Sequence, residues 1–177
     1  MTQEDLETVK MDKDMVDIAY YHDLAQQKQK EHAKFLAKLR QKKPKHLDKV
    51  VKETHAEVFA VVDCTKCANC CKDLGPDFTE ADIERIAHAF RMNLGKFEDT
   101  YLRVDEDGDK VFQCMPCPFL GADNLCSIYP IRPKACREFP HTDRKKIYQI
   151  NKLTIQNTLY CPAAYLFVEK LRHKLQL

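Results

Sequence analysis

The stretch that decides the fold is Cys64-Thr-Lys-Cys67-Ala-Asn-Cys70-Cys71, in which four cysteines occupy eight consecutive residues. None of the nine cysteines of this 177-residue chain precedes the run, and the others follow at Cys114, Cys117, Cys126, Cys136 and Cys161. Thiolates at such short spacing converge on one point, as a soft metal ion or an iron–sulfur cluster requires. We therefore expect the cysteines to act together as metal ligands.

Disulfide bonding and simple burial are the two competing uses of these cysteines. Residues 1–7 have neither the basic nor the apolar segment of a secretion signal, so we expect a cytoplasmic protein. In a reducing compartment, clustered cysteines bind metal more often than they pair, and an odd number is awkward for a closed set of disulfides. Cysteines acting as small hydrophobic residues would account for one or two positions but not for the run.

The spacing is compatible with two kinds of metal centre. Zinc sites usually combine two C-x2-C pairs in one tetrahedron, and the chain has such pairs at Cys64/Cys67 and Cys114/Cys117. The alternative is an iron–sulfur cluster, because C-x2-C-x2-C supplies three ligands to a [4Fe–4S] cluster in bacterial ferredoxins, where the remaining cysteine precedes a proline. Here that spacing ends at Cys70, and the Cys-Pro pairs lie at 117–118 and 161–162.

The adjacent cysteines Cys70 and Cys71 carry a geometric prediction. Neighbouring side chains usually point apart, so we expect one to face Cys64 and Cys67 and the other to face the loop from Cys117 to Cys136. Nine cysteines are enough for two centres with four ligands each. The sequence does not partition them between such centres.

Several segments of the chain together resemble a known family. The run at 64–71 is followed by Cys-Pro-Phe-Leu at 117–120, Cys-Ser-Ile-Tyr at 126–129, Arg-Pro at 132–133 and Cys-Arg-Glu-Phe-Pro at 136–140. This pattern, from about Val61 to Cys161, resembles the CxxCxxCC cysteine-cluster family, which is described as zinc- or iron-chelating and includes the flagellin lysine N-methylases. Family members usually have Gly between the second and third cysteines, where this chain has Ala68-Asn69.

The resemblance implies a ligand set and a cofactor. Cys114 has no family counterpart and is left out of the set. The cysteines that the family pattern carries over as metal ligands are Cys64, Cys67, Cys70, Cys71, Cys117, Cys126, Cys136 and Cys161. We expect them to hold an iron–sulfur cluster, which we favour, or zinc or iron ions. The resemblance also implies an alternative function, a protein lysine N-methylase-like enzyme that uses S-adenosylmethionine.

Composition limits the other function classes. With 44% hydrophobic and 32% charged residues, the chain is expected to be soluble, and no apolar run approaches the roughly 20 residues that span a bilayer. The net charge of +2 does not indicate nucleic-acid binding. Charge is uneven, however, because residues 1–23 are mainly acidic and residues 24–46 mainly basic. A partner protein docking on this N-terminal part is the alternative to a solvated helix.

We predict a mainly α fold with a small β-hairpin and irregular cysteine-rich loops stapled by metal. The predicted domains are an N-terminal helical arm, 1–60, and a cysteine-cluster metal-binding domain, 61–177. Helices are expected at 12–41 and 47–62, from Thr79 onward, at 96–102 and at 163–175, with a hairpin turn at Asp107-Gly108 and a strand at 146–155.

No catalytic constellation accompanies the cysteines, so the sequence leaves open whether the protein is an enzyme. The chain lacks a Gly-rich phosphate loop, a dinucleotide-binding fingerprint and an H-E-x-x-H motif. His55 is expected to be a packed histidine rather than a ligand, and His141 a residue outside the metal site. Arg132 and Arg137 flank the later cysteines, where they could offset the negative charge of a thiolate-bound centre.

Overall fold

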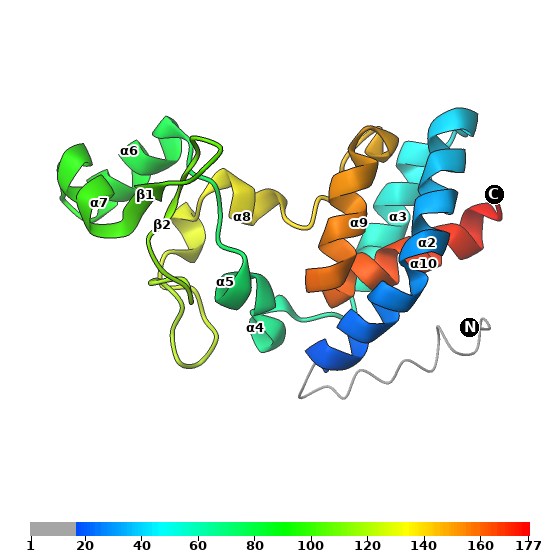
Figure 1. Ribbon diagram of the computed structural model, residues 1–177, viewed down its shortest axis with the longest axis horizontal. Coiled ribbons are helices and arrows are strands. Elements are labelled where there is room, and N and C mark those ends of the chain that lie inside the picture. Colours follow the sequence, from blue (N-terminus) through cyan, green and yellow to red (C-terminus); the bar gives the residue numbers. More distant parts are fainter. Residues whose placement is uncertain (1–16) are drawn as a thin grey trace. The chain divides into compact units, whose positions relative to one another are not determined.

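The computed structural model describes residues 17–177 and confirms a mainly α fold with a small hairpin (Figure 1). In chain order the elements are α2 (Ile18–Lys42), α3 (Leu47–Phe59), α4 (Cys64–Cys67), α5 (Asn69–Asp73), α6 (Glu80–Ala89), α7 (Leu94–Tyr101), β1 (Leu102–Val104), β2 (Lys110–Phe112), η1 (Tyr129–Ile131), α8 (Lys134–Glu138), η2 (Ile147–Ile150), α9 (Asn151–Tyr160) and α10 (Pro162–Leu175). No helix within residues 17–177 is both long and apolar enough to cross a membrane.

The chain forms two compact units. Of the described residues, unit 1 comprises 17–67 together with 140–177, and unit 2 comprises 68–139. In unit 1, α2 and α3 pack with α9 and α10. The predicted division into an arm, 1–60, and a domain, 61–177, stays a prediction, as does the partner protein expected at the arm.

Unit 1 is a helical unit built around α10 (red in Figure 1), which contacts α2, α3 and α9. Every residue from 162 to 169 is buried, and Tyr165, Phe167 and Leu171 are completely inaccessible to solvent. Such a helix is apolar on most sides because partner helices surround it, which agrees with the predicted core of the C-terminal helix. The predicted final helix at 163–175 is confirmed.

The predicted strand at 146–155 is wrong, because this segment contains η2 and the first half of α9. The buried side chains of the segment and its continuation, Ile147, Thr154, Asn157 and Thr158, recur at helical intervals. Three of them are polar, so the helical stripe is not visible as a hydrophobic pattern. Their polar groups are satisfied inside the unit: Thr154 and Thr158 donate to carbonyls of the preceding turn, and Asn157 donates to the Pro140 carbonyl.

The first predicted helix is confirmed from residue 18 to 42, and its predicted start at Asp12 lies outside the described residues. The helix is unbroken through its polar middle, where side-chain contacts with α10 stabilise it. His32 is fully buried, and its Nε2 lies 2.8 Å from Oε1 of Glu169. Glu169 also accepts from Arg172 at 2.6 Å, and Arg172 pairs with Glu31 at 3.0 Å. This ionic network joins α2 to α10.

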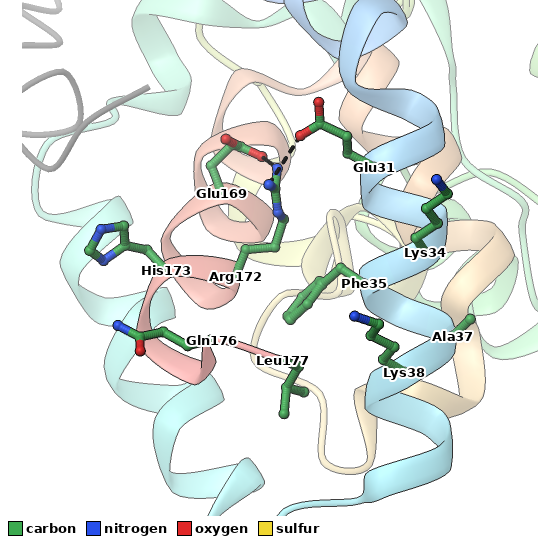
Figure 2. A pocket seen from close by; sticks show the side chains of 10 residues that line it. All are labelled: Glu31, Lys34, Phe35, Ala37, Lys38, Glu169, Arg172, His173, Gln176 and Leu177. Carbon is green, nitrogen blue, oxygen red and sulfur yellow. Dashed lines mark hydrogen bonds and ion pairs between the residues drawn. The ribbon is translucent and has the colours of Figure 1, made fainter.

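A groove of about 620 Å³ in unit 1 lies beside this network (Figure 2). Its lining comes from α2, from the C-terminal part of α10 and from the two residues that follow α10, and Figure 2 shows the Arg172 side chain directed toward Glu31. No cysteine belongs to the lining. The groove is therefore separate from the cysteine chemistry described below.

Unit 2 consists of short elements around an aromatic core. The hairpin is confirmed, with β1 and β2 antiparallel and the pair Arg103–Val111 at the centre of the register. Its turn contains Gly108 at φ +89°, and the Asp105 carboxylate accepts from two backbone N–H groups of the turn. This carboxylate is used as a turn acceptor, as an Asx turn requires. Phe112 and Phe119 pack edge to face at 5.7 Å within the core.

The predicted helix start at Thr79 is confirmed as a capping box at the start of α6. The Asp82 backbone N–H donates to the Thr79 hydroxyl at 3.2 Å, and the Asp82 carboxylate accepts from the Thr79 backbone N–H at 3.2 Å. Two N–H groups that the first helical turn leaves unpaired are thus satisfied reciprocally. Ile83, Ile86 and Ala87 form the buried face, whereas the predicted face member Phe90 is 40% exposed.

Candidate metal centre

All nine cysteines lie in the described part of the chain, and none of them is joined to another in a disulfide bond. The run at 64–71 folds as two short helical pieces. Cys64 and Cys67 are the first and last residues of α4, and Cys70 and Cys71 lie in α5. Ala68 separates the two pieces with φ 49° and ψ 15°, a left-handed conformation that glycine adopts more readily than alanine. A glycine at position 68 would adopt this conformation with less strain than Ala68 does.

Four thiols of unit 2 form one group, which we call the thiol tetrad: Cys71, Cys117, Cys126 and Cys136. They come from four separate segments, which backbone contacts bring together. The Cys117 N–H donates to the Cys71 carbonyl at 2.8 Å, and Leu120 forms an antiparallel bridge with Cys126. Cys117 and Cys126 also pack against the core of unit 2. Cys136 lies in α8, the helix that follows η1.

Mutual electrostatic coupling defines the membership of the thiol tetrad. Burial raises the pKa of Cys136 to about 12, and the charges of Cys71, Cys117 and Cys126 contribute to this rise. Burial likewise raises the pKa of Cys117 to about 11, with contributions from Cys71 and Cys126, and burial and Cys71 raise that of Cys126. Each of the four thiols is thus close enough to influence the other three. A bound cation would relieve this repulsion between thiolates.

Cys71 differs from its three partners. A hydrogen bond with the Cys70 thiol, followed by the nearby charge of Lys72, lowers the pKa of Cys71 to about 7 despite burial. The thiolate is the form that binds metal, and its availability depends on pKa. Cys71 is therefore the thiol of the tetrad that reaches the ligand form at the lowest pH.

Backbone N–H groups point at two of the sulfurs. The Cys117 sulfur accepts from the N–H groups of Phe119 and Leu120, and the Cys126 sulfur accepts from that of Ile128; each contact lowers the pKa of its thiol. Arg132 adds a nearby positive charge that lowers the pKa of both Cys126 and Cys136. Hydrogen bonds and positive charge of this kind stabilise thiolates and tune a bound metal.

Unit 1 contains a smaller group of three cysteines: Cys64, Cys67 and Cys161. Burial raises the pKa of Cys161 to about 12, and the charges of Cys64 and Cys67 add to this effect. Cys161 is the N-cap residue of α10, where its side chain forms no cap hydrogen bond, and the nearby backbone N–H groups of Ala164 and Ala163 lower the pKa of its thiol. Cys67 and Cys161 both pack against the core of unit 1.

The prediction that the side chains of Cys70 and Cys71 point apart is wrong, because their thiols are hydrogen-bonded to each other. Cys71 lies with the thiol tetrad, as expected for the member of the pair that faces the Cys117–Cys136 loop. The orientation of Cys70 toward Cys64 and Cys67 stays a prediction. Cys114, excluded from the predicted ligand set, is exposed and does not contribute to the couplings within either group. The assignment of the eight cysteines as ligands remains a prediction.

The donor set of the thiol tetrad fits a soft metal centre. Four thiolates are the ligands of all-cysteine zinc sites and of both common types of iron–sulfur cluster. Within residues 17–177 no three Cys, His, Asp or Glu side chains already stand at the spacing that holds an ion. The tetrad is therefore a converging set of thiols rather than a closed coordination shell.

Two histidines singled out in the sequence have neighbours in unit 1. His55 is half-buried, its Nδ1 lies 2.8 Å from the Thr142 hydroxyl and its ring packs on Phe59, so it is a packed histidine as expected. His141 is half-buried with φ +63°.

Arg132, one of the two arginines of unit 2 that the sequence singled out, stacks over the ring of Tyr129 at 3.8 Å and donates to its carbonyl.

Two residues beside the thiol tetrad escaped the sequence interpretation. Asp82 was recognised only as part of a helix start, and Arg85 was not singled out. Both contact the segment that leads into Cys136, 46 to 52 positions further along the chain. The capping pattern at Thr79 was the one signal that could have drawn attention to Asp82.

Comparison with known proteins gives one match. The model of the CxxCxxCC family, described as "Putative zinc- or iron-chelating domain", matches residues 63–162, a segment that contains all nine cysteines and more than half of the 177 residues. No curated protein and no solved structure matches the chain.

Proposed function

The chain belongs to the CxxCxxCC family of zinc- or iron-chelating domains, and on this basis we propose that its principal metal centre is the thiol tetrad. The observation that carries the proposal is the mutual coupling of four thiols from four segments of unit 2. A structural role alone does not require four half-buried thiols to lie close together, because their charged forms repel each other. A bound metal ion or cluster would offset that repulsion, because the thiolates would become its ligands.

We propose an iron–sulfur cluster as the cargo of the tetrad in preference to zinc. Four thiolates around a cluster leave net negative charge, and two features of the site would offset it. One is the positive charge of Arg132 near Cys126 and Cys136, and the other is the set of backbone N–H groups that point at Cys117 and Cys126. Hydrogen bonds to sulfur and local charge are among the factors that set the potential of such clusters.

The three cysteines of unit 1 support a second, separate centre. Cys161 presents its sulfur at the start of α10, where helix N–H groups favour a thiolate, and Cys64 and Cys67 lie within electrostatic range of it. Cys70 lies in unit 2, where its thiol hydrogen-bonds with that of Cys71, so in this proposal it is a ligand on the side of the tetrad. In this proposal all eight cysteines of the predicted set are ligands, and Cys114 is not.

The chemistry of the two groups is that of binding. The thiol groups must lose their protons to ligate, so metal uptake releases protons. The apolar cores against which Cys67, Cys117 and Cys126 pack restrict access of water to the sulfurs. A centre held in this way serves structural stability, sensing or electron transfer.

Anaerobic purification followed by metal analysis and visible absorption tests the identity of the metal. An iron–sulfur cluster predicts equal amounts of iron and acid-labile sulfide and a brown protein. Colourless protein that contains zinc and no sulfide would replace the cluster with a zinc site. Protein without either metal after anaerobic purification, and unable to take up zinc or iron in vitro, would contradict the proposed function.

A methylase-like function is the alternative that the family resemblance raises. It requires a site for S-adenosylmethionine in addition to the cysteines. Calorimetry of the metal-loaded protein with S-adenosylmethionine distinguishes the two functions, because a metal-holding protein without this activity gives no binding heat. Saturable binding would favour the methylase.

A further inference from the structure

We propose that Asp82 and Arg85 of α6 are positioning residues for the metal centre, because they hold the segment that carries Cys136 in place. The inference rests on the proposed function of the thiol tetrad. All the residues involved belong to unit 2. Neither residue is a proposed ligand, and both act through the backbone of residues 131–134.

The Asp82 carboxylate caps two helices at once. One oxygen accepts from the backbone N–H and hydroxyl of Thr79, at 3.2 and 2.7 Å, and so closes the cap of α6. The other accepts from the backbone N–H of Lys134, the first residue of α8, at 3.0 Å. Pro133 stands at the N-cap of α8 and has no side-chain acceptor, so Asp82 supplies the cap that the local sequence lacks. Its carboxylate is 1% exposed and is fully used by these donors and Arg85.

Arg85 holds the two residues immediately before that cap. Its guanidinium donates to the carbonyl of Ile131 at 3.3 Å and to that of Arg132 at 3.0 Å, and it pairs with Asp82. Pro130 and Pro133 remove two N–H groups from this segment, so its backbone has few hydrogen-bonding options of its own. The planar fork of an arginine can bridge two carbonyls, which the ammonium of a lysine does less well.

The short length of α8 makes this support necessary for Cys136. The helix has five residues, Lys134–Glu138, and Cys136 is its third. Isolated helices of this length are unstable because nucleation is unfavourable. The place of the Cys136 sulfur beside the other three thiols therefore depends on what holds the start of α8, and that is α6.

Zinc titration of the full, reduced chain against a competing chelator tests this inference with four variants. D82N leaves a single acceptor oxygen, which cannot cap both helices, and removes the charge that faces Arg85. T79A weakens only the cap of α6, R85K keeps the charge beside Asp82 but loses the fork, and C136S removes the ligand. We expect D82N and R85K to lower zinc affinity at the tetrad about tenfold or more, the effect typical of residues that orient metal ligands. T79A should lower the melting temperature while zinc affinity stays close to wild type.

A double-mutant comparison separates positioning from general destabilisation. If Asp82 acts through Cys136, D82N causes little further loss of zinc in the C136S background, because the affected ligand is already absent. Undiminished loss in that background, or equal zinc affinity in D82N, R85K and T79A, would overturn the inference while the proposed function stands. If D82N does not fold, R85K alone decides. A wild-type chain that binds no metal would overturn both.

Discussion

Unit 1 and unit 2 differ in what holds them together. Among the described residues, the core of unit 1 has sixteen buried hydrophobic residues and helices of up to 25 residues. The core of unit 2 has nine, and its longest element has ten residues. A small apolar core with short elements is the situation in which metal ligation contributes most to stability. We therefore expect packing to stabilise unit 1, whereas unit 2 should depend on the metal that its cysteines bind.

Metal removal should produce the largest difference between the two units. After complete chelation under reducing conditions, we expect backbone amides of residues 68–139 to lose hydrogen-exchange protection, because the metal no longer links the four segments that carry the thiols of unit 2. Amides of α2, α3 and α10 should stay protected by the core of unit 1. Zinc added back should restore protection. An unchanged exchange pattern in fully metal-free protein would contradict the dependence of unit 2 on metal.

Single cysteine substitutions should have the next largest effect, a loss of metal from one cysteine group and not from the other. Serine is a poor ligand for soft metals. C117S and C136S should weaken metal binding at the tetrad by more than the roughly 100-fold that is the upper range for residues outside the ligand set. C161S should reduce metal at the unit 1 group and spare the tetrad. C114S is the matched control, and metal content in this variant as low as in C67S would show that the ligand assignment is wrong.

The buried ionic network should matter for unit 1 alone. E169Q keeps an acceptor oxygen but removes the negative charge that faces Arg172 and buried His32, and breaking such an ion pair costs about 3 kcal/mol of unfolding free energy. Urea unfolding followed by helical circular dichroism measures this loss, and the number of bound metal ions should not change. Loss of metal in E169Q equal to that in C136S would show that the two units are not energetically separate.

Lowering the pH should destabilise unit 1 through the same network, because the pKa of Glu169 is lowered in the folded protein. Burial opposes ionisation, but the hydrogen bond from His32 and the charge of Arg172 outweigh it and lower the pKa of Glu169 below its ordinary value. A carboxyl with a lowered pKa contributes stability above its ordinary pKa and loses it as pH falls through the folded value. Wild-type unit 1 should therefore lose more stability than E169Q as the pH falls from neutral through the ordinary pKa of a glutamate and below it, as two urea series would reveal.

The smallest expected effect concerns a helix cap in unit 2. The Asn93 side chain accepts from the Lys96 backbone N–H at 2.8 Å at the start of α7. N93A should cost about 1 kcal/mol, and the cost should appear in the melting temperature of the metal-loaded protein. Metal affinity should stay at the wild-type value, since this cap does not touch the thiol tetrad. A tenfold loss of affinity would mean that any weakening of unit 2 reaches the centre.

Local chemistry explains which parts of the fold were predictable. The Asp-Gly turn, the capping box at Thr79 and the helix that ends before Pro44 each depend on residues within a few positions of one another. The strand expected at 146–155 failed for the opposite reason. Its buried faces include polar residues such as Thr154 and Asn157, whose hydrogen bonds inside unit 1 make burial acceptable. The alternation of apolar and polar residues in a sequence does not reveal which buried polar side chains find hydrogen-bond partners.

The sequence by itself determined that this is a cysteine-cluster protein with a mainly α fold, because ligand type, spacing and family pattern are local properties of the chain. Only the tertiary structure decided how the thiols gather. Cys71 and Cys136 are 65 positions apart in sequence, and their coupling depends on how α5 and α8 meet within unit 2. The contact of Asp82 with the start of α8 is equally invisible in the sequence. Electrostatic coupling and hydrogen bonding act over a few ångströms of space, and only folding brings these residues within that distance.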